Sequence, residues 1–198
     1  MAVGRERDGV SITVVIPTID ERHDQLDRAV ASVQAQSLPA EVEIEFDRLR
    51  TGAAATRNRA LERVDTEWVA FLDDDDEFKP NHLRACARNA ALTGADLVYP
   101  WFDCDAEDKI GMFGVPFDPV LLRKRNYIPV TVLVRTELVR AVGGFRDHPD
   151  VNGDPCEDWG LWLALLDAGA VFSHLPQRTW IWHNGAGTRG RGTTNNER

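Results

Sequence analysis

Residues 68–78 read WVAFLDDDDEF, so that the apolar stretch Trp68–Leu72 runs directly into four consecutive aspartates, Asp73–Asp76. A continuous apolar run of this length is typical of a strand that is buried on both faces of a sheet. In open sheets of parallel strands, ligands bind beyond the carboxyl ends of the strands. The four carboxylates therefore stand where such a sheet would hold its functional groups.

On either side of this stretch, the sequence alternates between strand and helix patterns. Strands are predicted from the β-branched run at 11–16, from the alternation of acidic and apolar residues at 41–46, and at 96–100, 127–135 and 179–183. Helices are predicted over 24–36, 53–64, 80–92, 136–142 and 157–168. This alternation predicts an α/β domain whose mostly parallel sheet is flanked by helices.

The chain of 198 residues is long enough for one domain, which we expect to span 11–183 between flexible termini at 1–10 and 184–198. Its formal net charge of -9 argues against nucleic acid as a partner, since phosphate binding needs concentrated Lys and Arg. No apolar run suits a membrane span or a signal peptide, so we expect a cytoplasmic protein. Three widely spaced cysteines predict free thiols rather than a disulfide framework.

The aspartate cluster has two interpretations. Adjacent carboxylates repel one another, and their oxygen atoms are the ligands that Mg²⁺ and Mn²⁺ prefer. In extended backbone, Asp73 and Asp75 would project to one side, and Asp74 and Asp76 to the other. The alternative is a solvated acidic turn in which Asp76 caps the next helix. The position at the end of a buried strand favours the metal site.

A further carboxylate, Asp158, lies in the segment DPCEDWGLWLALLDAG, which begins at Asp154. Asp154 fits a helix N-cap and Glu157 fits a capping-box acid, which gives Glu157 a structural role. Asp158 shares a helical face with Leu161 and Leu165, the face that should look inward. An inward carboxylate is a candidate general base, and it is equally compatible with a structural hydrogen bond to a neighbouring loop.

Two cationic or titratable residues have local patterns that leave their roles open. Arg57 shares a helical face with Leu61 and Val64, so it either points from that helix into a cleft or snorkels at the surface. His183 ends the aromatic strand at 179–183, where a lone histidine is more often structural than a ligand. It becomes a candidate only if the fold brings it to the aspartates.

Taken in order, these segments resemble the family 2 glycosyltransferases of the GT-A fold over about 11–183. The motifs that carry the resemblance are TVVIPT (13–18), ATRNRAL (55–61), WVAFLDDDDEF (68–78), VGGF (142–145) and EDWGLWLAL (157–165). The resemblance implies a metal-dependent, inverting enzyme that moves a sugar from a nucleotide-diphosphate donor to an acceptor hydroxyl. A UDP-sugar is the donor that it favours, and the acceptor would be a glycan, a lipid or a protein.

The resemblance also implies four donor-binding positions. Thr18 would line the nucleoside pocket, Asp47 would contact the base or ribose, and Arg57 would reach the nucleotide from its helix. Asp73 would lie near the ribose. Members of the family usually carry a further strand before the ARN motif, whereas here only RLRTGAAAT separates Asp47 from Arg57.

For the chemistry itself, the resemblance implies that Asp75 ligates Mn²⁺ or Mg²⁺, with His183 as an additional ligand. Asp158 would deprotonate the acceptor hydroxyl. The glycine-rich tail after His183 carries Arg189 and Arg191, and it would either close over the donor diphosphate or be a terminus without a role.

Two other interpretations remain open. One is a reduced relative that binds a nucleotide or a glycan without turnover, which the short segment after Asp47 favours. The other is a sugar nucleotidyltransferase, which would need a glycine-rich basic loop after the first strand. The sequence there is PTIDERHD (17–24), which argues against it.

Overall fold

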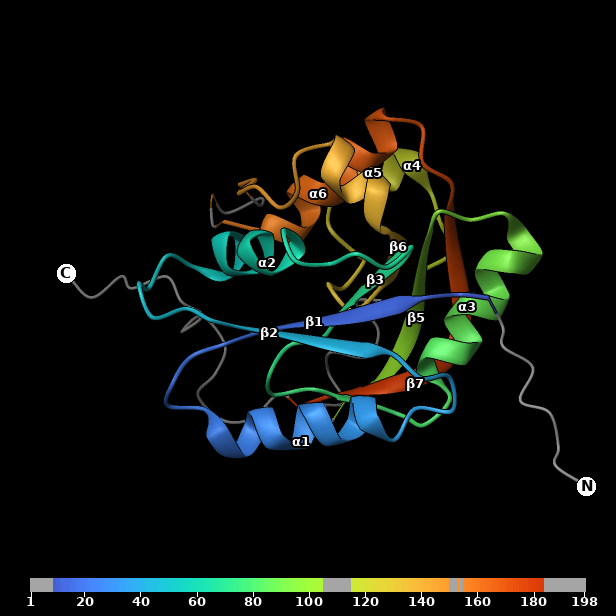
Figure 1. Cartoon of the computed structure of the whole chain (residues 1–198). Helices are drawn as coiled ribbons and strands as arrows, with labels where there is room; N and C mark the ends of the chain where they lie inside the picture. Colours follow the sequence, from blue (N-terminus) through green and yellow to red (C-terminus); the bar gives the residue numbers. More distant parts are fainter. Residues whose placement is uncertain (1–8, 105–114, 150–152, 154, 184–198) are drawn as a thin grey trace, which may run out of the picture.

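The computed structural model describes residues 9–104, 115–149, 153 and 155–183. In this part of the chain, seven strands form one sheet in the order β2-β1-β3-β6-β5-β7-β4 (Figure 1). The strands are β1 (Ile12–Thr18), β2 (Glu41–Phe46), β3 (Trp68–Phe71), β4 (Glu77–Phe78), β5 (Leu97–Cys104), β6 (Leu133–Arg135) and β7 (Phe172–Trp182). The helices are α1 (His23–Gln34), α2 (Ala53–Leu61), α3 (His82–Thr93), α4 (Pro119–Leu122), α5 (Thr136–Ala141) and α6 (Glu157–Asp167).

Most of these strands run in one direction. β1 pairs in parallel with β2 and β3, and β5 pairs in parallel with β7. The short β6 is antiparallel to both β3 and β5, so it joins the two parallel groups. β4 is antiparallel to β7. The expectation of a mostly parallel sheet flanked by helices is confirmed, with β4 and β6 as reversed strands.

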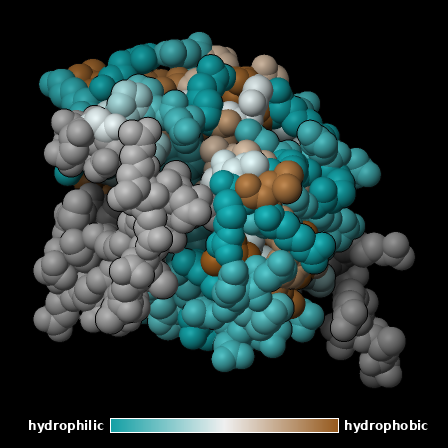
Figure 2. Space-filling view, turned by 90° about the vertical axis from the view of Figure 1, so that its left-hand side faces the viewer, coloured by the Kyte–Doolittle hydropathy of each residue, from teal (hydrophilic) through white to brown (hydrophobic). Residues whose placement is uncertain are grey.

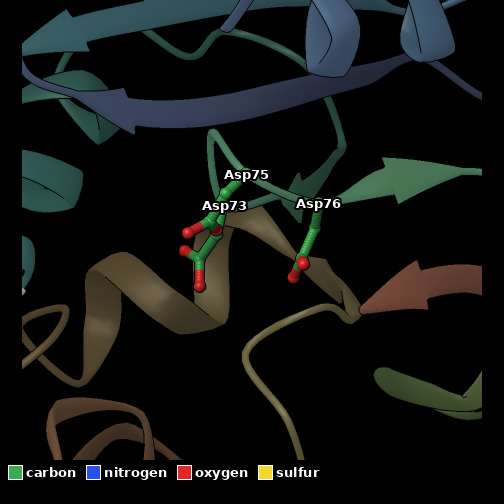
Figure 3. Close-up of side chains that lie close together, drawn as sticks. All are labelled: Asp73, Asp75 and Asp76. Atoms are coloured by element: carbon green, nitrogen blue, oxygen red, sulfur yellow. The ribbon is translucent and has the colours of Figure 1, made fainter. Parts of the chain in front are cut away.

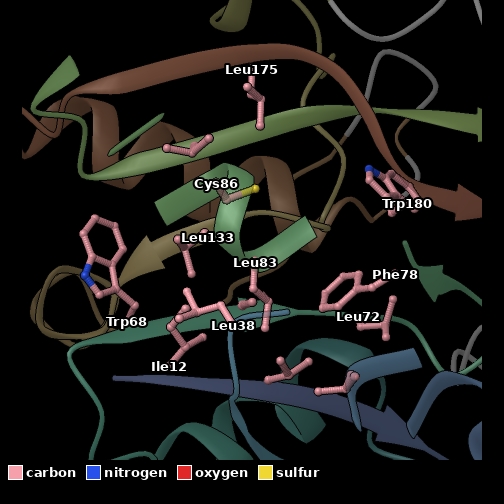
Figure 4. Close-up of a cluster of buried hydrophobic side chains, with 14 of the residues drawn as sticks. Ile12, Leu38, Trp68, Leu72, Phe78, Leu83, Cys86, Leu133, Leu175 and Trp180 are labelled. Carbon is pink, nitrogen blue, oxygen red and sulfur yellow. The ribbon is translucent and has the colours of Figure 1, made fainter. Parts of the chain in front are cut away.

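Two hydrophobic clusters fill the two faces of the sheet. α1 lies below the sheet in Figure 1, whereas α2, α5 and α6 lie above it. The cluster in Figure 4 holds Ile12, Leu72 and Leu83. The opposite cluster holds Val15 and Phe71, neighbours in sequence of residues in the first cluster. Because successive strand residues point to opposite faces, β1 and β3 must be apolar at nearly every position, which explains their continuous apolar sequences.

Several predicted elements have different bounds in the structure; β7, for example, begins at Phe172, well before the strand expected over 179–183. Of the strand expected over 127–135, only β6 forms, because Pro129 has no N–H donor for a strand ladder and the chain there runs as loop. The helix expected over 157–168 does begin at Glu157, but its N-cap differs from the expected one. Pro155 forms a bridge with Pro149 in extended backbone, so the helix begins at Glu157 with Cys156 as its N-cap.

Several expectations concern residues beyond the described ones. The proposed N-cap Asp154 and the tail with Arg189 and Arg191 lie outside the described residues, as do most residues of both expected termini. Among the described helices, none has the length and apolar character that crossing a bilayer requires. The extent of the domain and its cytoplasmic location stay predictions.

Three segments that are distant in sequence pack against one another above the sheet. Asn58 of α2 donates to the backbone oxygen of Phe145 and accepts from its N–H, both at 2.8 Å. Gly144 packs directly on the Asn58 amide with φ +74, which favours glycine. Gly160 of α6 lies against the backbone oxygen of Arg146. This packing fixes the start of α6 relative to α2.

We expect Gly160→Ala to lower the free energy of unfolding by about 1–3 kcal/mol, because the new Cβ would overlap the backbone oxygen of Arg146. In an open helix the same change stabilises by about 1 kcal/mol, so the sign of the effect is the test. Urea denaturation measures it, with Gly9→Ala as control, since an added Cβ at Gly9 meets nothing within 4 Å. A Gly160→Ala protein as stable as the parent would contradict the close approach.

Candidate active site

Three of the four aspartates converge just beyond β3. Carboxylate oxygens of Asp73, Asp75 and Asp76 all lie within 4.8 Å of one another (Figure 3). A tight turn produces this geometry, in which the N–H of Asp76 donates to the backbone oxygen of Asp73 at 3.1 Å. The alternating arrangement expected for extended backbone is therefore wrong for Asp76, which joins Asp73 and Asp75. Asp76 does not cap the next helix either, because Asn81 is the N-cap of α3.

The cluster carries negative charge that its surroundings only partly neutralise. Burial, reinforced by the charges of Asp73 and Asp74, raises the pKa of Asp75 to about 6. Burial and the charges of Asp73 and Asp75 also raise the pKa of Asp76 above its ordinary value. Closely spaced carboxylate oxygens with surplus negative charge suit a hard divalent cation such as Mg²⁺ or Mn²⁺. The residues present thus fit the metal that the sequence analysis expects.

The fourth aspartate, Asp74, points elsewhere and joins the cluster to β1. The hydroxyl of Thr18 donates to Asp74 at 2.6 Å, and the Arg22 guanidinium donates at 2.7 Å. Arg22 also lies 3.6 Å from Asp75. Thr18 is therefore at the cluster, with its hydroxyl engaged by Asp74, and its contact with a nucleoside stays a prediction. Sequence reasoning missed Arg22, because its only signal was a basic residue shortly after a strand.

Asp47 follows β2 and lies buried in the turn before α2. It accepts hydrogen bonds from the N–H groups of Thr51 and Gly52 at 2.9 and 2.8 Å, and Arg59 pairs with it at 3.3 Å. Although burial opposes ionisation, these backbone donors hold the pKa of Asp47 below its ordinary value. The carboxylate thus orders the short segment between β2 and α2. It is not joined to the aspartate cluster by these contacts, and its role toward a base or ribose stays a prediction.

Arg57 of α2 links the aspartate cluster to the start of α6. One guanidinium nitrogen donates to Asp73 at 2.5 Å and another to Glu157 at 2.7 Å. The residue is only 3% exposed, and its guanidinium lies 5.3 Å from the centre of the Phe145 ring. Burial opposes the charge, but Asp73 and Glu157 outweigh it and raise the pKa of Arg57 above its ordinary value. The alternative of a snorkelling surface arginine is wrong.

The role expected for Glu157 is also wrong. It was interpreted as a capping-box acid, but it is the first residue of α6, whose N-cap Cys156 makes no side-chain cap bond. Because the N-cap lies directly before Glu157 rather than three residues earlier, the Glu157 carboxylate is not in the capping-box position and pairs with Arg57 instead. Sequence reasoning had no local signal for this long-range pair.

Asp158 is the neighbour of Glu157 and lies on the loop side of α6. Its Oδ1 accepts hydrogen bonds from Asn126 Nδ2 at 3.0 Å, from Cys156 Sγ at 3.2 Å and from the N–H of Trp159 at 2.8 Å. Burial, followed by the charge of Glu157, raises the pKa of Asp158 to about 6. Through Arg57, the aspartate cluster is therefore linked to Glu157, the residue before Asp158. Sequence reasoning did not identify Asn126.

His183 follows β7 and contacts the aspartate cluster through its backbone. Its N–H donates to Asp76 at 3.0 Å, whereas its Nε2 lies 2.6 Å from Glu77, which also pairs with Arg28 at 3.1 Å. The structure thus brings His183 to the cluster, with its imidazole facing Glu77. Its expected role as a metal ligand stays a prediction.

Figure 2 views the molecule from the left-hand side of Figure 1, the side toward which β1 and β2 run. Over the described part of this face, hydrophilic side chains surround a few apolar groups (Figure 2).

Comparisons with known proteins agree with this geometry. The model of the family described as Glycosyl transferase family 2 matches residues 41–127. The putative teichuronic acid biosynthesis glycosyltransferase TuaG of Bacillus subtilis (strain 168) is 28% identical over 152 residues, which are 69% of this chain and 54% of TuaG. The O-antigen biosynthesis protein RfbC of Myxococcus xanthus is 28% identical over 129 residues, which are 63% of this chain and 10% of RfbC.

Among solved structures, residues 1–349 of S. aureus TarS match with a TM-score of 0.69 and 18% sequence identity, over 87% of this chain and 60% of that one. The same TarS fragment has been solved in complex with UDP and with UDP-GlcNAc. The chain spans about half the length of TuaG and a tenth of RfbC. The family model, these relatives and the shared fold together support a family 2 glycosyltransferase of the GT-A fold.

Proposed function

We propose that this chain transfers a sugar from a nucleotide-diphosphate donor, a UDP-sugar, to an acceptor hydroxyl with inversion at the anomeric carbon. One observation carries the proposal. Buried Arg57 pairs at once with Asp73 of the aspartate cluster and with Glu157, the residue before Asp158. A site for an anionic donor and a candidate base are thereby held as one unit.

On the donor side, Asp75 would hold Mn²⁺ or Mg²⁺, together with Asp73 or Asp76 and with His183 as an additional ligand. When bound, the metal neutralises charge that builds on the departing diphosphate. UDP as the nucleotide is supported by the TarS complexes with UDP and UDP-GlcNAc, which share the fold. Thr18, Asp47 and Asp73 are proposed to contact the nucleoside.

On the acceptor side, Asp158 would take the proton from the attacking hydroxyl. A carboxyl group with a pKa of about 6 is ionised at neutral pH and is still basic enough to accept a proton in the transition state. In-line attack from the side opposite the diphosphate inverts the anomeric centre. The raised proton affinity of Asp158 thus supports catalysis over the alternative of a relative that binds without turnover.

We expect UDP to bind at least tenfold more tightly with Mn²⁺ than with chelator, and Asp75→Ala to remove that difference, because Asp75 is the proposed metal ligand. Isothermal titration calorimetry measures both affinities. Asp65→Ala, which removes an exposed carboxylate from the loop before β3, is the matched control and should keep the metal effect. Equally tight UDP binding in chelator would contradict the metal assignment.

We expect Asp158→Asn to lower transfer by roughly two orders of magnitude or more while leaving the affinity for UDP unchanged. In the parent protein, the rate should rise with pH through about 6, because only the ionised Asp158 accepts a proton. The assay is UDP release from a UDP-sugar over a panel of hydroxyl acceptors. Asp167→Asn, at the other end of α6, is the control. Near-normal turnover by Asp158→Asn would rule out the base role.

Arg57→Met should lower the free energy of unfolding by about 3–5 kcal/mol, because it leaves Asp73 and Glu157 as unpaired, partly buried carboxylates. Urea denaturation provides the measurement. Arg63→Met is a matched control, since Arg63 also pairs with two carboxylates but its side chain is 47% exposed; it should cost less than about 1 kcal/mol. Similar losses in the two variants would show that the bridge does not hold the site together.

A further inference from the structure

The two oxygens of Asp158 have different surroundings. Oδ1 accepts the three hydrogen bonds from Asn126, Cys156 and the N–H of Trp159. Within the described residues, no hydrogen bond reaches Oδ2. A carboxylate that is held by one oxygen keeps a fixed orientation and presents the other oxygen to a reactant.

Asn126 is itself firmly placed. It lies in the loop between α4 and β6, and its Oδ1 accepts from the N–H of Ile128 at 3.2 Å. The next two residues, Tyr127 and Ile128, are fully buried in the hydrophobic cluster above the sheet. With its oxygen engaged by the backbone, the amide must turn its Nδ2 toward Asp158.

Cys156 holds Asp158 from the other side. Its backbone N–H donates to the oxygen of His148 at 2.8 Å, which anchors the residue at the start of α6. Burial, followed by the charge of Asp158, raises the pKa of the Cys156 thiol to about 12, so the thiol remains a protonated donor at neutral pH. Asn126 Nδ2 also lies 3.5 Å from the Cys156 sulfur, so the three side chains form one connected group.

Building on the proposed function, we propose that Asn126 and Cys156 are positioning residues, which hold Oδ1 of Asp158 so that Oδ2 receives the proton of the acceptor hydroxyl. In this step the hydroxyl O–H bond breaks and its proton passes to Oδ2. The oxygen electron pair forms the bond to the anomeric carbon of the donor. The bond from that carbon to the diphosphate oxygen breaks, and its electron pair leaves with the nucleotide diphosphate.

The charged groups that face Asp158 act against one another. Glu157 of α6 disfavours its ionisation, whereas Arg57 of α2 favours it. The thiol of Cys156 and the N–H of Trp159 also favour the ionised form. The pKa of Asp158 is already raised, and losing the hydrogen bond from the neutral Asn126 should raise it further.

Asn126→Asp is the sharpest test, because it keeps the size of the side chain and an oxygen for the N–H of Ile128. The new carboxylate replaces the donating NH₂ and repels Asp158, so the pKa of Asp158 should rise by about one unit or more. ¹³C NMR of labelled aspartate without substrate measures this pKa, and UDP release as a function of pH measures its effect on the rate. The rate should fall about fivefold or more at pH 6 and recover only in part above pH 8, because high pH restores the ionised Asp158 but not its hydrogen bond from Asn126, with the KM for the donor unchanged.

Further variants separate positioning from a purely structural role. Cys156→Ser keeps a donor and should keep the parent pH profile, whereas Cys156→Ala should shift it in the same direction as Asn126→Asp, by less. Asn81→Asp adds the same charge at an exposed position before α3 and should leave the profile unchanged.

The inference is overturned if Asn126→Asp leaves the pKa of Asp158 and the pH profile unchanged while Asp158→Asn is inactive; the proposed function would then still stand. An equal loss of rate at every pH would also overturn it, since that is the result of a structural defect. Normal turnover by Asp158→Asn would instead mean that the proposed base role has failed.

Discussion

The buried guanidinium of Arg57 is the constraint on which the rest of the site depends. A cation with 3% exposure is tolerated only if it is paired, and its two partners come from segments far apart in the chain, Asp73 after β3 and Glu157 at the start of α6. Arg57 and Glu157, which pair directly, are 100 residues apart in the sequence. If the aspartate cluster and α6 moved apart, the Arg57 guanidinium would therefore be exposed or would lose one of its partners.

The glycines of the surrounding motifs follow from the same constraint. Arg57 reaches Glu157 only if α2 and α6 approach closely, and the residue next to it, Asn58, is tied to both backbone groups of Phe145. A side chain at Gly144 would strike Asn58, and one at Gly160 would strike the backbone of Arg146. The glycines of the VGGF and EDWG segments thus allow the close packing that lets Arg57 reach Glu157.

The fold was predictable where the signal is local. The central strands are buried on both faces, so segments such as WVAFL can be recognised as apolar runs. The aspartates could then be placed at the end of a strand from the sequence alone. The partners of Arg57, Glu157 and Asp158 were not predictable, because each is set by tertiary proximity. A helical arginine has the same local pattern whether it snorkels or is buried between two acids. The capping-box interpretation of Glu157 failed for a related reason: Pro155 pairs with Pro149 in a bridge, so the N-cap is Cys156 and Glu157 is the first helical residue.

Charge explains why a chain with a formal net charge of -9 can serve an anionic donor under the proposed function. Within the described residues, Arg22 and Arg57 are ion-paired with Asp73, Asp74 and Glu157, and the further carboxylates of Asp75 and Asp76 lie beside them. A diphosphate that approached this arrangement alone would meet repulsion. Burial is the main cause of the raised pKa of Asp75, and the charges of Asp73 and Asp74 add to it. Under the proposed function, a divalent cation would both relieve this surplus of negative charge and supply the attraction for the diphosphate, so metal and donor should bind as a pair rather than as independent ligands.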